Sequence, residues 1–116
     1  MEEEKQEMYN YMEEIIGGYG YEFLNLNDHY AEIGLDFASD FSDYGGHTNA
    51  LGARKCTEYL CGYLTGRYGL EDRRGQEGYE SWEKAYGQWK EEMDLAEETI
   101  ARRIAEEDFA DAPAEE

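Results

Sequence analysis

The stretch DFSDYGGHTNALGARK, residues 40–55, decides how the rest of the chain is interpreted. It places His47 in a glycine-rich segment, with Asp40 and Asp43 before it and the predicted start of a helix after it. The glycine pair that precedes the histidine allows a tight backbone turn between a carboxylate and the ring. Such a loop exposes an imidazole while the helix holds the loop in place, which is how a catalytic base is often presented.

The residue types in this stretch suit acid–base chemistry. A neutral imidazole is the usual general base near neutral pH, because its unperturbed pKa lies there. We expect Asp43 to accept a hydrogen bond from one ring nitrogen of His47, so that the other nitrogen can take a proton from a nucleophile. Asp40 is the alternative orienting carboxylate. Asn49 is the predicted N-cap of the following helix, since its side-chain oxygen can accept from the first free backbone N–H groups.

The segments around this loop predict a helix-dominated α/β fold. Apolar residues at helical spacing predict three helices, at residues 2–16, 50–67 and 79–109. Residues 21–27 carry apolar side chains on both faces, which is typical of a short strand covered on both sides in a parallel sheet. In the His-bearing loop, residues 28–49, the apolar piece 33–37 fits either a turn of helix or a second, edge strand.

The predicted sheet is incomplete. One or two short parallel-type strands cannot pair their own edges or form a covered core. We therefore predict a single partial α/β domain over residues 1–109 and a disordered acidic tail over residues 110–116. The partial sheet indicates the C-terminal third of a larger domain, either truncated or reduced to a mainly helical remnant.

Composition and charge exclude several classes of function. The chain has 116 residues and a formal net charge of -19. Nucleic acid and anionic membrane surfaces would repel such a chain, and the sequence shows neither a basic patch nor an apolar run of membrane-spanning length. Its acidic N-terminus is unlike a signal peptide, so the sequence as it stands predicts a cytoplasmic protein.

The cysteines do not predict a disulfide or a metal site. Cys56 and Cys61 lie five residues apart on a predicted helix, so their side chains point in different directions. No CxxC pair is present, which argues against zinc, and both residues are expected to act as small hydrophobes. We expect neither a metal nor a cofactor in the site.

The block around His47 resembles the last conserved block of the SGNH/GDSL hydrolases, whose pattern is D-x-x-H-x-N-x-x-G. His47, Asn49 and Gly52 match that pattern, and Lys55 continues an H-x-N-x-x-G-x-x-K run. Three further segments are similar to their counterparts in bacterial members of the family, namely residues 23–28, 34–36 and 82–86. The resemblance covers roughly residues 5–92.

This resemblance implies a fold and an activity. The fold would be the C-terminal third of a three-layer α/β/α sandwich with a parallel sheet. The activity would be ester hydrolysis or acyl transfer by a serine nucleophile, with His47 as the base and Asp43 as its partner. The implied substrates of the intact family are acylated carbohydrates or acyl groups of the cell envelope, and intact relatives include extracytoplasmic proteins.

The chain departs from the family pattern at two places. The family's aspartate stands three residues before the histidine, where this chain has Tyr44, whereas Asp43 stands four before it. The chain also has no Gly-Asp-Ser block and no recognisable oxyanion block, and its only serines are Ser39, Ser42 and Ser81. The sequence therefore predicts a chain that is inactive by itself.

A second interpretation is a small acidic helical interaction module. The last predicted helix carries an a/d-like apolar seam with spacings of 4, 3, 4, 3 and 4, made of Trp82, Tyr86, Trp89, Met93, Ala96 and Ile100. Through the first four of these residues the chain would bind a second copy of itself or a missing N-terminal portion.

A third interpretation is a metal-binding acidic loop. Asp36, Asp40, Asp43 and His47 would be its ligands. Their spacing does not match a calcium-binding loop, in which about six oxygen ligands follow a fixed pattern.

Overall fold

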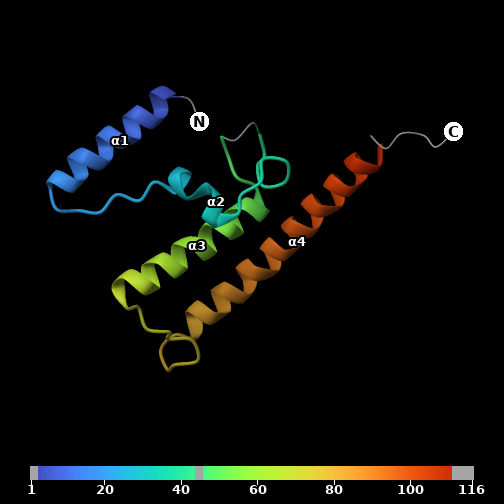
Figure 1. Ribbon diagram of the computed structural model, residues 1–116. Helices are drawn as coiled ribbons and strands as arrows, with labels where there is room; N and C mark the ends of the chain where they lie inside the picture. Colours follow the sequence, from blue (N-terminus) through green and yellow to red (C-terminus); the bar gives the residue numbers. More distant parts are fainter. Residues whose placement is uncertain (1–2, 44–45, 111–116) are drawn as a thin grey trace. The chain divides into compact units, whose positions relative to one another are not determined.

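The computed structural model describes residues 3–43 and 46–110, and its regular structure is helical (Figure 1). The elements are α1 (Glu3–Gly18), the 3-10 helix η1 (Leu26–His29), α2 (Tyr30–Ile33), α3 (Ala50–Tyr68) and α4 (Glu80–Ala110). Most of the predicted tail, residues 111–116, lies outside the described residues. None of the described helices has the length and apolar character needed to cross a bilayer.

The predicted parallel strand at residues 21–27 is wrong. No strand occurs in residues 3–43 and 46–110, and the structure is 69% helical, which overturns the α/β sandwich expectation. Leu26 begins η1 instead, where the Asn25 side chain caps the turn by accepting from the Asn27 amide at 3.1 Å. The physical reason is that a lone extended segment has no neighbouring strand to satisfy its backbone groups, whereas a local turn satisfies them itself.

The chain divides into two units, and residues 1–33 form the first. In this unit α1 is tied to η1 by a hydrogen bond of 3.1 Å from the Gln6 amide to the Asp28 carboxylate. None of the residues of α1 is buried, and its apolar stripe, which includes Met8 and Ile15, is exposed to solvent. Within its unit, α1 therefore does not pack its apolar stripe against a hydrophobic core.

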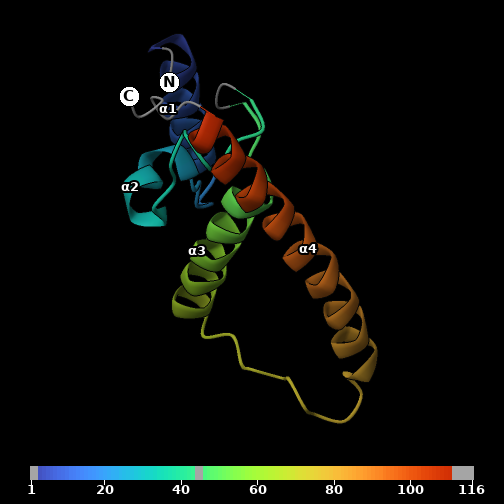
Figure 2. The same ribbon diagram turned by 90° about the vertical axis from the view of Figure 1, so that its right-hand side faces the viewer.

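The second unit, residues 34–116, contains α3, α4 and the loop that carries His47. The start of α3 packs against the middle of α4, where Arg54 forms ion pairs with Asp94 at 2.9 Å and with Glu97 (Figures 1 and 2). α3 ends at Gly69, which adopts the left-handed conformation with φ of 60° and donates its N–H to the Thr65 carbonyl. A polar connection, residues 69–79, then leads into α4.

The seam predicted on α4 is divided along the helix. Its later part is half-buried, at Met93, Ala96 and Ile100, whereas Trp82, Tyr86 and Trp89 are exposed. The structure therefore places the aromatic part of the seam on a free surface of this unit and the aliphatic part beside α3.

Candidate functional site

The loop that carries His47 is closed by backbone hydrogen bonds. Phe41 and Thr48 form an isolated antiparallel bridge, and the Ser42 amide donates to the His47 carbonyl at 2.9 Å. Below the bridge, the Asn49 amide donates to the Asp40 carbonyl at 2.9 Å. The two legs of the loop thus lie side by side without belonging to a sheet.

Asn49 joins this loop to α3, as its predicted N-cap position requires. Its side-chain oxygen accepts from the amides of Leu51 at 2.9 Å and Gly52 at 3.2 Å. Its side-chain nitrogen donates to the carbonyls of Ser39 at 2.7 Å and Phe41 at 3.4 Å. One side chain therefore begins the helix and also holds the opposite leg of the loop.

The structure brings Asp43 and His47 together. Oδ2 of Asp43 lies 2.6 Å from Nδ1 of His47, and Oδ1 accepts the backbone amides of Gly46 at 2.7 Å and His47 at 2.9 Å. The side-chain and backbone hydrogen bonds from His47 lower the pKa of the Asp43 carboxyl to about 2. Asp43 is therefore a carboxylate across the neutral pH range.

This geometry suits an oriented base. A carboxylate that accepts from Nδ1 holds the proton on that nitrogen, which leaves the lone pair on Nε2 to accept a proton from a reactant. The His47 side chain is 83% exposed, so the ring is open to an approaching group. Asp43 is fixed in this position because its carboxylate also accepts the backbone amides of Gly46 and His47.

Asp40 has a different set of partners. Its side chain is 1% exposed, and Oδ2 accepts from Lys55 Nζ at 2.6 Å and from the Asp36 amide at 2.8 Å. The Ser39 hydroxyl donates to Oδ1 at 3.2 Å. Burial raises the pKa of the Asp40 carboxyl, but the hydrogen bonds from Lys55 and Asp36 outweigh this, so the pKa lies below its usual range. Asp40 therefore anchors the loop, and Asp43 is the carboxylate beside the imidazole.

Lys55 and Gly52 hold this loop in place, whereas the sequence identified them only as matches to a motif. Lys55 also donates to the Gly34 carbonyl at 3.0 Å, so it holds two points of the loop. Gly52 is required because a Cβ atom there would come within 2.3 Å of the Asp40 carbonyl oxygen. In the sequence, the Asp40–Lys55 ion pair is visible only as an aspartate and a lysine fifteen residues apart. Such a spacing does not identify an ion pair.

The acidic residues do not form a metal site among the residues that the structure describes. No group of three or more histidine, cysteine, aspartate or glutamate side chains there is arranged to hold an ion. Asp36 accepts from the Ala38 amide at 2.9 Å, while Asp40 and Asp43 pair with Lys55 and His47. The proposed ligands thus point to separate partners.

Of the three serines, Ser42 lies on the same loop as the imidazole, where its amide donates to the His47 carbonyl at 2.9 Å. The Ser39 hydroxyl bonds to Asp40, and Ser81 lies in the first turn of α4. Within residues 3–43 and 46–110, no serine hydroxyl makes a hydrogen bond to the His47 ring. The described site therefore holds an imidazole that is paired with a carboxylate and is not hydrogen-bonded to a serine hydroxyl.

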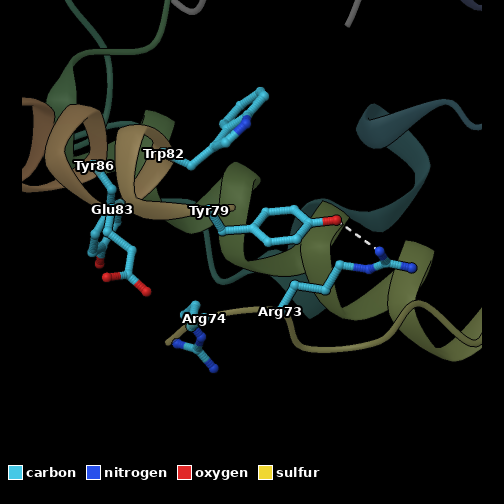
Figure 3. Close-up of a pocket in the computed structure, with 6 residues that line it drawn as sticks. All are labelled: Arg73, Arg74, Tyr79, Trp82, Glu83 and Tyr86. Carbon is cyan, nitrogen blue, oxygen red and sulfur yellow. Dashed lines mark hydrogen bonds between the residues drawn. The ribbon is translucent and has the colours of Figure 1, made fainter. Parts of the chain in front are cut away.

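A second surface feature lies at the start of α4. A shallow cavity of about 600 Å³ is lined by Arg73, Arg74, Tyr79, Trp82, Glu83 and Tyr86 (Figure 3). The Arg73 guanidinium donates to the Tyr79 hydroxyl at 2.7 Å, and the Gly75 amide bonds to the Glu83 carboxylate. These contacts fold the connection onto the helix, while Trp82 remains 73% exposed.

Comparison with protein-family models, with curated proteins and with solved structures finds no match to this chain. The likeness to the SGNH/GDSL block therefore rests on His47, Asn49, Gly52 and Lys55 themselves. Any functional assignment therefore depends on the geometry of the loop, above all on the Asp43–His47 pair.

Proposed function

We propose that the loop around His47 is the base-bearing half of a serine esterase or O-acyltransferase site of the SGNH/GDSL type. The serine and the oxyanion donors would come from polypeptide outside these 116 residues. The observation that supports this proposal is the pairing of Asp43 Oδ2 with His47 Nδ1 at 2.6 Å on an exposed loop. The proposed substrates are acyl esters of carbohydrates or of the cell envelope.

The proposed chemistry uses His47 twice. Nε2 takes the proton of the serine hydroxyl as its oxygen attacks the ester carbonyl carbon, and Asp43 stabilises the resulting imidazolium. The imidazolium then returns the proton to the leaving alcohol, so that an acyl-enzyme and a free alcohol result. Water or an acceptor alcohol removes the acyl group by the same route in reverse.

The isolated chain should have no esterase activity that depends on this loop. We expect the wild-type chain to hydrolyse p-nitrophenyl acetate no faster than the His47→Ala variant, apart from the slow reaction of any exposed imidazole. His29→Ala is the matched control, because His29 also has a carboxylate partner, Glu32 at 3.2 Å. A rate tenfold above that of His47→Ala, in both the wild type and His29→Ala, would show that the chain is active without a second segment.

The hydrolytic role itself is tested by complementation. The serine-bearing part of an SGNH esterase, lacking its own last block, would be fused to this chain and treated with a fluorophosphonate that labels activated serines. We expect labelling in the wild-type and His29→Ala fusions and at least a hundredfold slower labelling with His47→Ala or Asp43→Asn. Equal labelling in all four fusions, or none in the wild type, would contradict the proposed role.

The exposed aromatic face of α4 supports a second candidate function, that of a protein-interaction surface. Trp82, Tyr86 and Trp89 recur at spacings of four and three residues, and all three are exposed in the unit that contains α4. A contiguous exposed aromatic face marks an interaction site more often than scattered apolar residues do. We propose that its occupant is the serine-bearing segment, because the site around His47 is incomplete without one.

A binding experiment separates this occupant from self-association. Tryptophan fluorescence would be followed as the same serine-bearing segment is added to the unfused chain, and light scattering would give the mass of the chain alone. We expect a monomer, since two chains of net charge -19 repel each other, and a spectral shift on addition. Trp82→Ser should abolish binding, whereas Leu95→Ser, which changes another exposed residue of α4, should not. A dimer that Trp82→Ser dissociates would assign the face to a second copy instead.

A further inference from the structure

We propose that the ion pair between the buried Asp40 and the partly exposed Lys55 is a positioning device for His47, through which Lys55 sets the orientation of the base without touching it. This inference rests on the proposed function and adds two positioning residues to the same site. It predicts that the imidazole loses its orientation when the ion pair is broken, even though Asp43 is still present.

Lys55 ties both ends of the segment 34–40, which leads into the His47 loop, to α3. Lys55 lies on α3 and donates both to the Asp40 carboxylate at 2.6 Å and to the Gly34 carbonyl at 3.0 Å. Asp40 also accepts from the Asp36 amide at 2.8 Å. A single ammonium group therefore holds two points of the chain, six residues apart, against one helix.

The route from this pair to His47 is short and consists of backbone contacts. The carbonyl of Asp40 accepts from the Asn49 amide at 2.9 Å, and the bridge between Phe41 and Thr48 comes next. The Ser42 amide then bonds to the His47 carbonyl at 2.9 Å. Because Asp43 follows Ser42 directly, the position of Asp40 sets the position of both members of the Asp43–His47 pair.

The Asp43–His47 pair is too exposed to hold the ring by itself. The side chains of His47 and Asp43 are 83% and 42% exposed. Exposed ion pairs contribute little because solvent screens the charges and two side chains lose rotamer freedom. Asp40, at 1% exposed, is instead surrounded by protein, and its only cationic partner among the described residues is Lys55. The less exposed pair of the site is therefore Asp40 with Lys55, whose side chain is 38% exposed.

The test is an NMR measurement of the His47 tautomer in the full chain. Long-range proton–nitrogen spectra near pH 8 report how much of each imidazole carries its proton on Nδ1, and His29 is an internal reference in every sample. We expect His47 to be mainly the Nδ1–H form in the wild type. In Lys55→Met this population should fall toward that of a free imidazole, while the His29 signals and the helical circular dichroism stay unchanged.

Two further variants distinguish positioning from general stability. Lys55→Arg keeps a cation beside Asp40 and should restore the wild-type tautomer population. Lys90→Met removes an exposed lysine that pairs with Asp94 within α4, and should leave His47 unchanged. A wild-type tautomer population in Lys55→Met would overturn the inference, and so would an equal change in Lys90→Met. None of these readouts depends on ester turnover, so the inference can fail while the proposed function survives.

Hydrogen exchange in the wild type covers the case in which Lys55→Met does not fold. If the buried pair controls the loop, the amides of Ser42 and Asn49 should open together and show protection factors within about threefold of each other. Protection of Asn49 that exceeds that of Ser42 by a hundredfold or more would show that the His47 end of the loop moves independently. That result would also overturn the inference.

Discussion

The loop around His47 and the aromatic face of α4 belong to a unit with a small core, and they differ in how their side chains are satisfied. In the loop, carboxylates, amides and one lysine bond to one another, and Asp40 is nearly inaccessible to solvent. The aromatic face offers Trp82, Tyr86 and Trp89, and in the described part of its unit these side chains stay exposed. Hydrogen bonds and an ion pair fix the conformation of the short loop. The aromatic face of α4 is larger and apolar, but the described residues of its unit do not bury it.

This difference indicates where function resides in each region. Hydrogen bonds and an ion pair with a buried carboxylate specify one geometry, which suits a group that must be aimed at a reactant. Apolar side chains are not directional and gain free energy when any complementary surface covers them, which suits association with a partner. Breaking the loop should therefore cost stability and orientation, and altering the aromatic face should cost binding alone.

The largest effect is expected from Gly52→Ala. The new methyl group would meet the Asp40 carbonyl at 2.3 Å, so the loop must separate from α3, at a cost of about 3 kcal/mol in the free energy of unfolding. Gly62→Ala is the matched control on the same helix, because a Cβ there meets nothing within 4 Å, and it should gain about 0.5–1 kcal/mol. Urea denaturation followed by circular dichroism measures both, and equal midpoints would contradict the close packing of loop and helix.

Asn49 variants separate the helix cap from the tie across the loop. Asn49→Ala removes both and should cost about 1–2 kcal/mol in the same urea experiment. Asn49→Asp keeps an oxygen for the amides of Leu51 and Gly52 but loses the donor to the carbonyls of Ser39 and Phe41. It should therefore preserve α3 while the His47 amide exchanges faster. If Asn49→Asp exchanges like the wild type, the tie across the loop contributes nothing.

The two parts of the α4 seam should respond differently to truncation. Ile100→Ala removes a half-buried side chain beside α3 and should cost about 1 kcal/mol, less than a fully buried site would. Trp82→Ala removes an exposed side chain, and the stability of the isolated chain should change by less than about 0.5 kcal/mol. Equal costs in thermal or urea unfolding would mean that the aromatic end is covered in solution.

The smallest effect is expected on acidification. The pKa of Asp43 falls to about 2 in the folded chain, below the unfolded value of about 4, so its contribution is present above pH 4 and is lost as the pH falls toward 2. The exchange protection of the His47 amide should decrease through this window. In Asp43→Asn the same protection should be low at every pH, so a wild-type response in that variant would assign the transition to another group.

Several features could be predicted from the sequence because they depend on neighbours along the chain. The helices at residues 50–67 and 79–109 were expected from apolar spacing, and α3 and α4 occupy nearly these ranges. The cap at Asn49 follows from local backbone hydrogen bonds, which need no distant partner. The proximity of Asp43 and His47 is local in the same sense, since a turn of four residues brings them together.

The strand at residues 21–27 shows why the rest could not be predicted. An apolar pattern indicates which faces a segment can cover, but a strand exists only beside another strand, and none is present in the described residues. The same limit applies to the seam of α4, where spacing predicted one continuous surface and packing against α3 covered only its later part.

The sequence by itself determined three of the helices, the cap at Asn49, the acidic charge and the presence of a histidine on a glycine-rich loop. The sequence favoured Asp43 as the carboxylate beside that histidine and left Asp40 as the alternative, and only the tertiary structure showed that Asp40 pairs with Lys55 instead. Asp40 and Asp43 are the same residue type three positions apart, and composition does not distinguish them. Asp40 is buried beside α3 and pairs with Lys55, because a buried carboxylate requires a cation. Asp43 is more exposed and pairs with His47.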